Sequence, residues 1–157
     1  VLEGGVSTKC VVMSWLKGSV GGQKAAGLGN DVIMTDKYHC YFDCYQTDTR
    51  EGELFAHKRN IPLEKVWSYN PIGGMDDASA SHVLGVQCNT WTEHISSMDR
   101  VYFMNLPRMA ALAEVAWSTP ASLSGYQDFL QRLQSSLIPI YQPAGWNFAE
   151  FYKKDIK

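Results

Sequence analysis

The sequence has little of what marks a membrane protein, a disulfide-stabilised protein or a metalloprotein. It has no apolar run of the roughly 18 residues that a membrane span needs. Four cysteines in 157 residues are too few for a disulfide framework, so we expect buried free thiols. The four histidines lack the HExxH spacing, and we expect no metal and no other cofactor. A net charge of −2 favours neither nucleic acid nor an anionic membrane as a partner.

An initiator methionine and a signal peptide are also missing from the first residues, Val1-Leu2-Glu3-Gly4-Gly5. We interpret the chain as a piece cut from a longer protein. A complete (β/α)8 barrel needs about 250 residues, so this chain is too short to form one. We therefore expect one partial domain over residues 1–157, with an irregular tail over residues 138–157.

Short apolar runs alternate with segments of helical periodicity. The runs predict strands over residues 10–15, 31–34, 40–43 and 83–91. Helices are predicted over residues 21–28, 63–67, 98–117 with a break at Pro107, and 126–137, whereas residues 46–62 are predicted as a loop. Ser97 is the expected N-cap of the third helical region, and the expected packed face behind it includes Leu106, Met109, Ala110, Leu112, Ala113 and Trp117. This alternation favours an α/β fold with parallel strands.

Aromatic and acidic residues lie where the predicted strands end. Trp15, Tyr41, Asp43, Trp91 and Glu93 hold such positions. Aromatic rings cover the apolar faces of a pyranose, and carboxylates accept hydrogen bonds from its hydroxyls. These residue types alone leave alternatives open, since the aromatic residues also suit a protein core and the acids also suit a solvated loop.

Several motifs follow one another along residues 1–137. They are Val12-Met13-Ser14-Trp15, Tyr41-Phe42-Asp43, Tyr69-Asn70-Pro71, Leu84-Gly85-Val86-Gln87, Trp91-Thr92-Glu93, Leu106-Pro107-Arg108 and the run from Ala110 to Ser118. Each is weak alone, but their succession resembles the glycoside hydrolase family 20 β-N-acetylhexosaminidases. The resemblance implies an α/β fold made of the C-terminal portion, about strands six to eight, of a (β/α)8 TIM barrel.

The resemblance also implies roles for the aromatic and acidic residues. Tyr41 matches the catalytic tyrosine that hydrogen-bonds the substrate's 2-acetamido group as charge develops. Trp15 and Trp91 match walls around the acetamido methyl and the sugar ring, and Asp43 and Glu93 match residues that hold the distal hydroxyls. Tyr69 stands where many members have another substrate-binding aromatic residue.

The family's catalytic Asp-Glu pair would lie upstream of this chain. Gly73-Gly74-Met75-Asp76-Asp77 resembles that motif only superficially, and we interpret it as a turn. The resemblance therefore implies a fragment of a hexosaminidase that uses substrate-assisted retaining catalysis and is inactive alone. The alternative is a non-catalytic carbohydrate-binding or interaction module derived from the family.

Three partners follow from this interpretation: a glycan with a terminal N-acetylhexosamine, the missing N-terminal part of the same barrel, and a second copy of the chain. The second copy is expected to pair with the unpaired strand edges, where Val12, Val86 and Cys88 are candidates for an exposed apolar patch. The family resemblance is consistent with a periplasmic or secreted parent, although the chain carries no signal. Arg108 and Glu114 are expected to form a structural ion pair.

Overall fold

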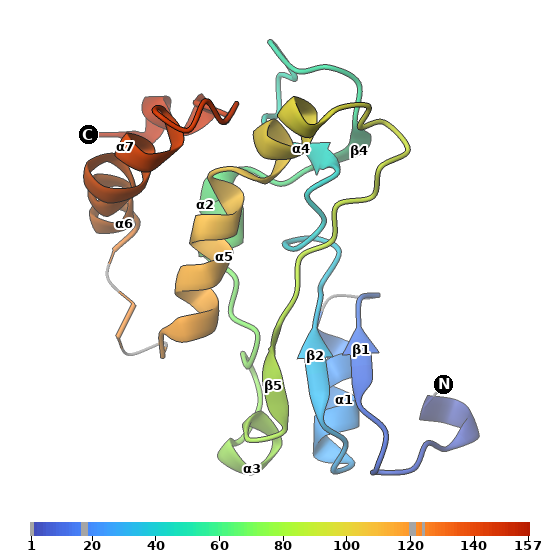
Figure 1. Cartoon of the computed structure of the whole chain (residues 1–157). Coiled ribbons are helices and arrows are strands. Elements are labelled where there is room, and N and C mark those ends of the chain that lie inside the picture. The colour runs from blue at the N-terminus through green and yellow to red at the C-terminus, as the bar shows by residue number, and fades with distance from the viewer. Residues whose placement is uncertain (1, 17–18, 120–121, 124) are drawn as a thin grey trace. The chain divides into compact units, whose positions relative to one another are not determined.

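The computed structural model describes residues 2–16, 19–119, 122–123 and 125–157. The chain divides into two compact units. The sheet unit comprises residues 1–40 and 70–87, and the helical unit comprises residues 41–69 and 88–157. Figure 1 labels the elements of both units.

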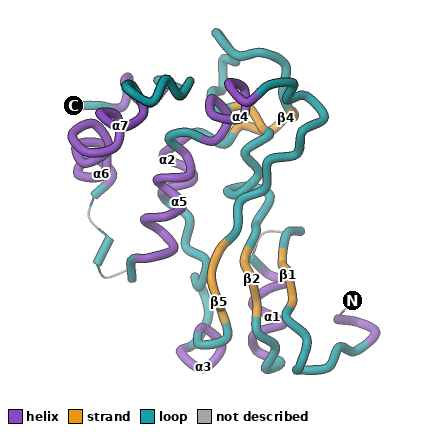
Figure 2. Tube along the Cα trace, viewed as in Figure 1, coloured by secondary structure: helices purple, strands orange, loops and turns teal. Residues whose placement is uncertain are grey.

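The sheet unit contains three parallel strands in the order β1-β2-β5. The strands are β1 (Val12–Ser14), β2 (Val32–Met34) and β5 (Val83–Val86). They are connected through α1 (Val20–Gly27) and, before β5, through α3 (Asp77–Ala80), as the coloured tube in Figure 2 shows. This confirms the predicted parallel α/β pattern and the strands predicted over residues 10–15, 31–34 and 83–91.

Helix α1 packs on the sheet through small residues. Gly22, Ala25 and Ala26 are its buried positions. A Cβ atom on Gly22 would overlap the Met34 sulfur and lie 3.1 Å from the Ser14 Cβ. The glycine therefore lets the helix approach the strands more closely than alanine would allow.

The exposed apolar residues of the sheet unit differ from the predicted ones. Val11, Met13 and Leu84 are 51%, 47% and 60% exposed, whereas Val12 and Val86 are half-buried. Successive strand residues point to opposite faces, and Val12 pairs with the buried Val32, so Val12 lies on the covered face. The predicted patch was therefore placed one residue out of phase.

The helical unit has a two-stranded parallel sheet of β3 (Cys44–Tyr45) and β4 (His57–Asn60). Strand β4 was predicted as loop because its sequence, His-Lys-Arg-Asn, is wholly polar. The predicted strand over residues 40–43 is reduced to one parallel bridge between Tyr41 and Asn89. In this bridge the Phe42 N–H donates to the Asn89 carbonyl at 2.8 Å.

Three helices form the centre of this unit: α2 (Leu63–Trp67), α4 (Met98–Asn105) and α5 (Arg108–Trp117). The predicted cap is confirmed, since the Ser97 hydroxyl accepts a hydrogen bond from the Arg100 N–H at 3.2 Å. Helix α2 packs against α5.

The packed face predicted for this region is confirmed at Leu106 and Leu112, which are buried, but the rest of it is out of phase. Trp117 is 92% exposed and Met109 is 48% exposed. The buried positions are Arg108, Ala111, Leu112 and Val115, which follow the i, i+3, i+4, i+7 spacing. An arginine starts this stripe, so a search for apolar residues alone misplaces it.

The C-terminal part is more regular than predicted. Helix α6 (Tyr126–Arg132) continues into a π-helical turn, η2 (Leu133–Leu137), which confirms the helix predicted over residues 126–137. The expected irregular tail contains α7 (Ile138–Tyr141) and the short 3₁₀ helix η3 (Phe151–Asp155); a further 3₁₀ turn, η1, covers Leu2–Gly4. Among the described residues, no helix is long and apolar enough to cross a membrane.

Candidate functional site

Two of the predicted pocket residues meet in the helical unit. The Tyr41 and Trp91 rings lie with centroids 6.5 Å apart and planes inclined by 48°. The backbone bridge between Tyr41 and Asn89 brings their segments together. Tyr41 is half-buried and Trp91 is 52% exposed, so the pair presents aromatic surface to solvent.

Asp43 lies two residues beyond Tyr41 and is 5% exposed. Its Oδ1 atom is buried and accepts no hydrogen bond from the residues that the structure describes. Burial raises the pKa of Asp43, and the charges of His57 and Arg108 are among the influences that oppose this rise. His57 is close, with its Nε2 atom 3.7 Å from Asp43 Oδ2. A buried acceptor that lacks a donor costs free energy.

Arg108 fixes the backbone around Asp43. Its side chain is fully buried and its guanidinium donates to four backbone carbonyls, those of Phe42, Cys44, Ile61 and Met104. Burial lowers the pKa of Arg108 to about 10, which leaves it cationic at neutral pH. The carbonyls of Phe42 and Cys44 flank Asp43, so Arg108 constrains the chain on both sides of that residue.

The predicted ion pair between Arg108 and Glu114 is wrong. Glu114 instead pairs with Arg132 at 2.6 Å and accepts a hydrogen bond from the Trp67 indole at 3.3 Å. Residues six apart on a helix lie on different faces, because only spacings of three or four bring side chains together. Arg108 therefore enters the core while Glu114 meets partners from other helices.

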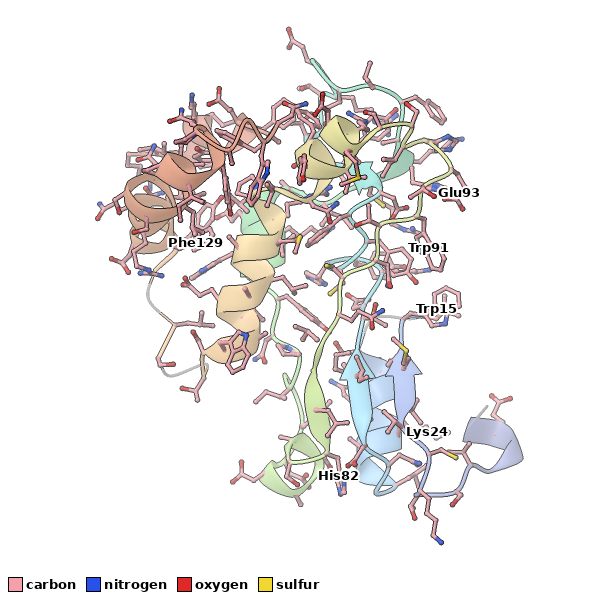
Figure 3. All side chains as sticks on the ribbon, viewed as in Figure 1. Trp15, Lys24, His82, Trp91, Glu93 and Phe129 are labelled. Atoms are coloured by element: carbon pink, nitrogen blue, oxygen red, sulfur yellow. The ribbon has the colours of Figure 1, made fainter. Side chains whose placement is uncertain are left out.

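The remaining predicted residues are distributed over both units. Trp15 follows β1 in the sheet unit and is 49% exposed. Glu93 is exposed and lies with Trp91 on the segment that leads to α4, where Figure 3 labels both. Tyr69 follows α2 and is only 4% exposed within the helical unit.

Sequence reasoning missed His57, His94 and Arg108. The two histidine rings lie 5.2 Å apart and, with Phe55, line an open depression beside Asp43. His57 lies on a polar strand that has no periodic signal, which explains the omission. The Leu106-Pro107-Arg108 motif contributes to the family resemblance, but nothing in it predicts that the arginine is buried.

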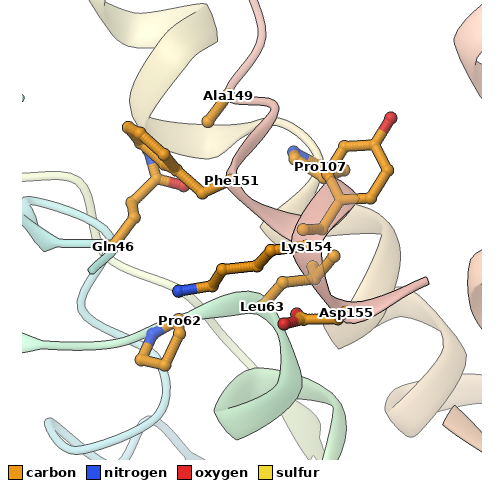
Figure 4. A pocket seen from close by; sticks show the side chains of 9 residues that line it. Gln46, Pro62, Leu63, Pro107, Ala149, Phe151, Lys154 and Asp155 are labelled. Carbon is orange, nitrogen blue, oxygen red and sulfur yellow. The ribbon is translucent and has the colours of Figure 1, made fainter. Parts of the chain in front are cut away.

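A second hollow of the helical unit is too small for a sugar. Figure 4 shows this cavity of about 20 Å³, which is lined by residues such as Leu63, Phe151 and Lys154. A space of this size accommodates about one water molecule. Within the described ranges, no cluster of three or more His, Cys, Asp or Glu residues is arranged to hold a metal.

The family model "Glycosyl hydrolase family 20, catalytic domain" matches residues 1–120. The chain belongs to glycoside hydrolase family 20. Its likeness to family 20 structures also shows that its α/β fold is that of TIM-barrel enzymes, although the described residues form no closed barrel.

Relatives within family 20 include a β-hexosaminidase of Porphyromonas gingivalis, 38% identical over 140 residues. That match covers 88% of this chain and 18% of the relative. A β-N-acetylhexosaminidase of Cellulomonas fimi is 32% identical over 110 residues, covering 69% of this chain and 22% of the relative. The chain thus spans about a fifth of the length of these family 20 proteins.

A solved family 20 structure is also similar. It is the exo-β-N-acetylglucosaminidase of Vibrio harveyi in complex with N-acetylglucosamine, with a TM-score of 0.81 and 29% identity. The match covers 92% of this chain and 22% of the Vibrio chain.

Proposed function

We propose that this chain is the pocket-wall part of a β-N-acetylhexosaminidase that removes terminal N-acetylglucosamine or N-acetylgalactosamine from glycans. The observation that carries the proposal is the Tyr41–Trp91 ring pair beside the buried acceptor Asp43, in a chain of family 20. We assign β1, β2 and β5 to three consecutive barrel strands, about the sixth to the eighth. The supporting observation is their parallel order.

The proposed reaction is substrate-assisted and retaining. The carbonyl oxygen of the substrate's acetamido group attacks the anomeric carbon, and the leaving oxygen departs with a proton from a general acid outside this chain. An oxazolinium ion forms, and water then opens it. The Tyr41 hydroxyl hydrogen-bonds the acetamido group as the oxazolinium ion forms. It holds the carbonyl oxygen in line with the anomeric carbon, which favours the transition state over bound substrate.

The other residues bind rather than react. Trp91 covers an apolar face of the sugar. Trp15 of the sheet unit is proposed separately as a substrate-binding aromatic residue. Asp43 and Glu93 accept hydrogen bonds from the distal hydroxyls. Tyr69 is proposed as a further wall, although its burial within the helical unit gives it a smaller share in binding.

The chain alone is proposed to be inactive, because the general acid and the residue that orients the acetamido group would lie outside it. Loss of general acid catalysis costs about 10²–10⁴-fold in rate. The test compares the full-length protein with this chain on para-nitrophenyl N-acetyl-β-glucosaminide. Release of nitrophenol by the full-length protein alone supports the proposal, whereas binding of N-acetylglucosamine without hydrolysis by either would favour the carbohydrate-binding alternative.

The exposed face of β1 and β5 is proposed to meet the rest of the barrel in the full-length protein. Met13 and Leu84 supply apolar surface there. In the isolated chain a second copy would cover these residues, giving a two-fold dimer. Light scattering of the isolated chain tests this, since a dimer has twice the 17.6 kDa of one chain and a stable monomer would contradict it.

A further inference from the structure

The sheet unit has a His–Asp pair at each end of its parallel strands. His39 Nδ1 lies 2.6 Å from Asp36 Oδ2, in the segment that follows β2. His82 Nδ1 lies 3.0 Å from Asp31 Oδ1, and these two residues directly precede β5 and β2. Figure 3 labels Trp15 and His82 at opposite ends of this unit. In a (β/α) barrel the carboxyl ends of the strands form the active site, whereas the amino ends serve stability, so the Asp36–His39 pair lies at the end where substrate binds.

The aspartate of the pair at the carboxyl end is buried. The side chain of Asp36 is 3% exposed, compared with 50% for that of Asp31. Its Oδ1 atom accepts no hydrogen bond from the residues that the structure describes. A carboxylate oxygen accepts hydrogen bonds, so the Nδ1–H of His39 is the donor in the 2.6 Å contact. The hydrogen bond from His39 therefore offsets part of the cost of burying the Asp36 carboxyl group.

The same two residues close a turn. The Asp36 carbonyl accepts hydrogen bonds from the N–H groups of His39 and Cys40, at 3.0 Å and 2.8 Å. The side-chain pair adds a further hydrogen bond between the first residue of the turn and the fourth. Lys37 lies inside this turn, so the direction of its N–H group is set by the conformation that these hydrogen bonds stabilise.

The turn holds the backbone of Trp15. The Thr35 N–H donates to the Ser14 carbonyl at 2.9 Å, and the Lys37 N–H donates to the Trp15 carbonyl at 3.2 Å. The residue pairs of β1 and β2 end at Ser14 and Met34, so the hydrogen bond from Lys37 extends the ladder beyond the last paired residues. Trp15 is therefore anchored from the turn at the point where β1 has ended.

We propose that Asp36 and His39 are positioning residues for the hydrolysis, because they fix the turn whose Lys37 N–H holds Trp15 in place for the sugar. The proposal rests on the proposed hexosaminidase function, in which Trp15 is a substrate-binding aromatic residue. Neither side chain of the pair takes part in a bond that forms or breaks. The pair acts through the backbone, so its effect on the reaction depends on the Trp15 ring.

The experiment measures kcat and KM of the full-length protein on para-nitrophenyl N-acetyl-β-glucosaminide. The test variant is Asp36→Ala with His39→Ala, which removes both partners and so leaves no buried carboxyl group without a donor. The matched control is Asp31→Ala with His82→Ala, which removes the pair at the amino ends of the strands. The two histidine side chains are similarly exposed, 27% for His39 and 37% for His82.

The test variant should raise KM about 5-fold and change kcat less than about 2-fold, because a displaced ring weakens the binding of substrate and transition state alike. The control should keep both constants. His39→Gln, whose side-chain amide can still donate to Asp36, should bind the substrate nearly as well as the parent protein. A KM that the test variant leaves unchanged, or that the control raises equally, would overturn the proposal.

A double-mutant cycle shows whether the pair acts through Trp15. In the Trp15→Ala background, removal of Asp36 and His39 should have no further effect on KM, because the ring that they position is gone. The same increase of KM in both backgrounds would overturn the proposal, since the pair would then contact the sugar directly or maintain the fold in general.

Hydrogen exchange separates failure of the positioning from failure of the proposed function. The Lys37 amide should exchange faster in the test variant, but at the parent rate in the control and in His39→Gln. If exchange changes in this way and the full-length protein hydrolyses no glycoside, the hold of the turn on Trp15 is supported while the proposed function fails. An unchanged exchange rate at Lys37 in the test variant contradicts the positioning itself.

Discussion

The two units satisfy their buried backbone groups by different means. In the sheet unit, three parallel strands bond to one another and α1 closes on them through Gly22, Ala25 and Ala26. In the helical unit, β3 has two residues and Tyr41 makes a single bridge, so the ladder ends close to the site. Arg108 supplies the donors that further strands would otherwise provide. The site residues Tyr41 and Asp43 thus depend on a side chain rather than on a sheet.

Of the substitutions considered, Arg108→Met in the full-length protein should destabilise the fold most. It leaves four carbonyls in a buried region without their donor, and losing one partner of a buried charged network costs about 3–5 kcal/mol. The thermal unfolding midpoint, followed by circular dichroism, should fall well below that of the matched variant Arg100→Met. Arg100 is also buried but donates to one carbonyl, that of Leu54. If the two variants lowered the unfolding midpoint equally, Arg108 would not stabilise the fold more than another buried arginine does.

Gly22→Ala tests the close packing of the sheet unit. The added Cβ would meet Met34 and Ser14, and overpacking of this kind costs about 1–3 kcal/mol. Gly27→Ala is the control on the same helix, because its Cβ would lie 3.7 Å from Ser79 Oγ, an ordinary contact. Denaturant unfolding of the full-length protein should show a loss for Gly22→Ala alone, and a neutral Gly22→Ala would mean that α1 adjusts its position.

The contributions of two aspartates to folding stability should change with pH in opposite directions. Burial raises the pKa of Asp43, so its contribution to stability is complete below the ordinary value of 3.8 and declines as pH rises through the raised pKa. Asp76 caps α3, and hydrogen bonds from Ser79 lower its pKa, so its contribution is present above 3.8 and declines as pH falls. Relative to the parent protein, Asp43→Asn should therefore gain stability on going from acid to neutral pH, whereas Asp76→Asn should lose it.

The measurement is the unfolding midpoint of each variant across this pH range. Parallel curves for the two variants would contradict the assignment of a buried carboxyl in one unit and a capping carboxyl in the other. This is the smallest of the three effects, since Asp76 is exposed to solvent.

The sheet unit was the more predictable of the two from sequence. Apolar runs identify β1, β2 and β5 because all three strands are largely apolar, and Ser97 shows that a capping signal is reliable in the helical unit as well. Strand β4 was not predicted because its residues are polar. The sequence of a strand also does not reveal which strand it pairs with. The out-of-phase face of α5 has a related cause, since its buried stripe begins with Arg108.

The candidate site was predictable in part. Tyr41 and Trp91 were chosen by residue type and family resemblance, and the structure brings their rings together. The environment of Asp43 was not foreseeable, because it depends on His57 and Arg108, which come from β4 and α5. Long-range contacts of charged residues have no periodic signature in the sequence, so the electrostatics of the site emerge only from the fold.

The most direct test of the proposed role of this chain is Tyr41→Phe in the full-length protein, assayed on para-nitrophenyl N-acetyl-β-glucosaminide. Removal of a hydroxyl that holds the acetamido group in its transition-state position should lower kcat about 10²-fold and leave KM nearly unchanged. Tyr102→Phe, which keeps the ring stacked on Trp146, is the matched control and should retain full activity. A Tyr41→Phe enzyme with normal kcat and a raised KM would contradict the catalytic role and make Tyr41 a binding residue.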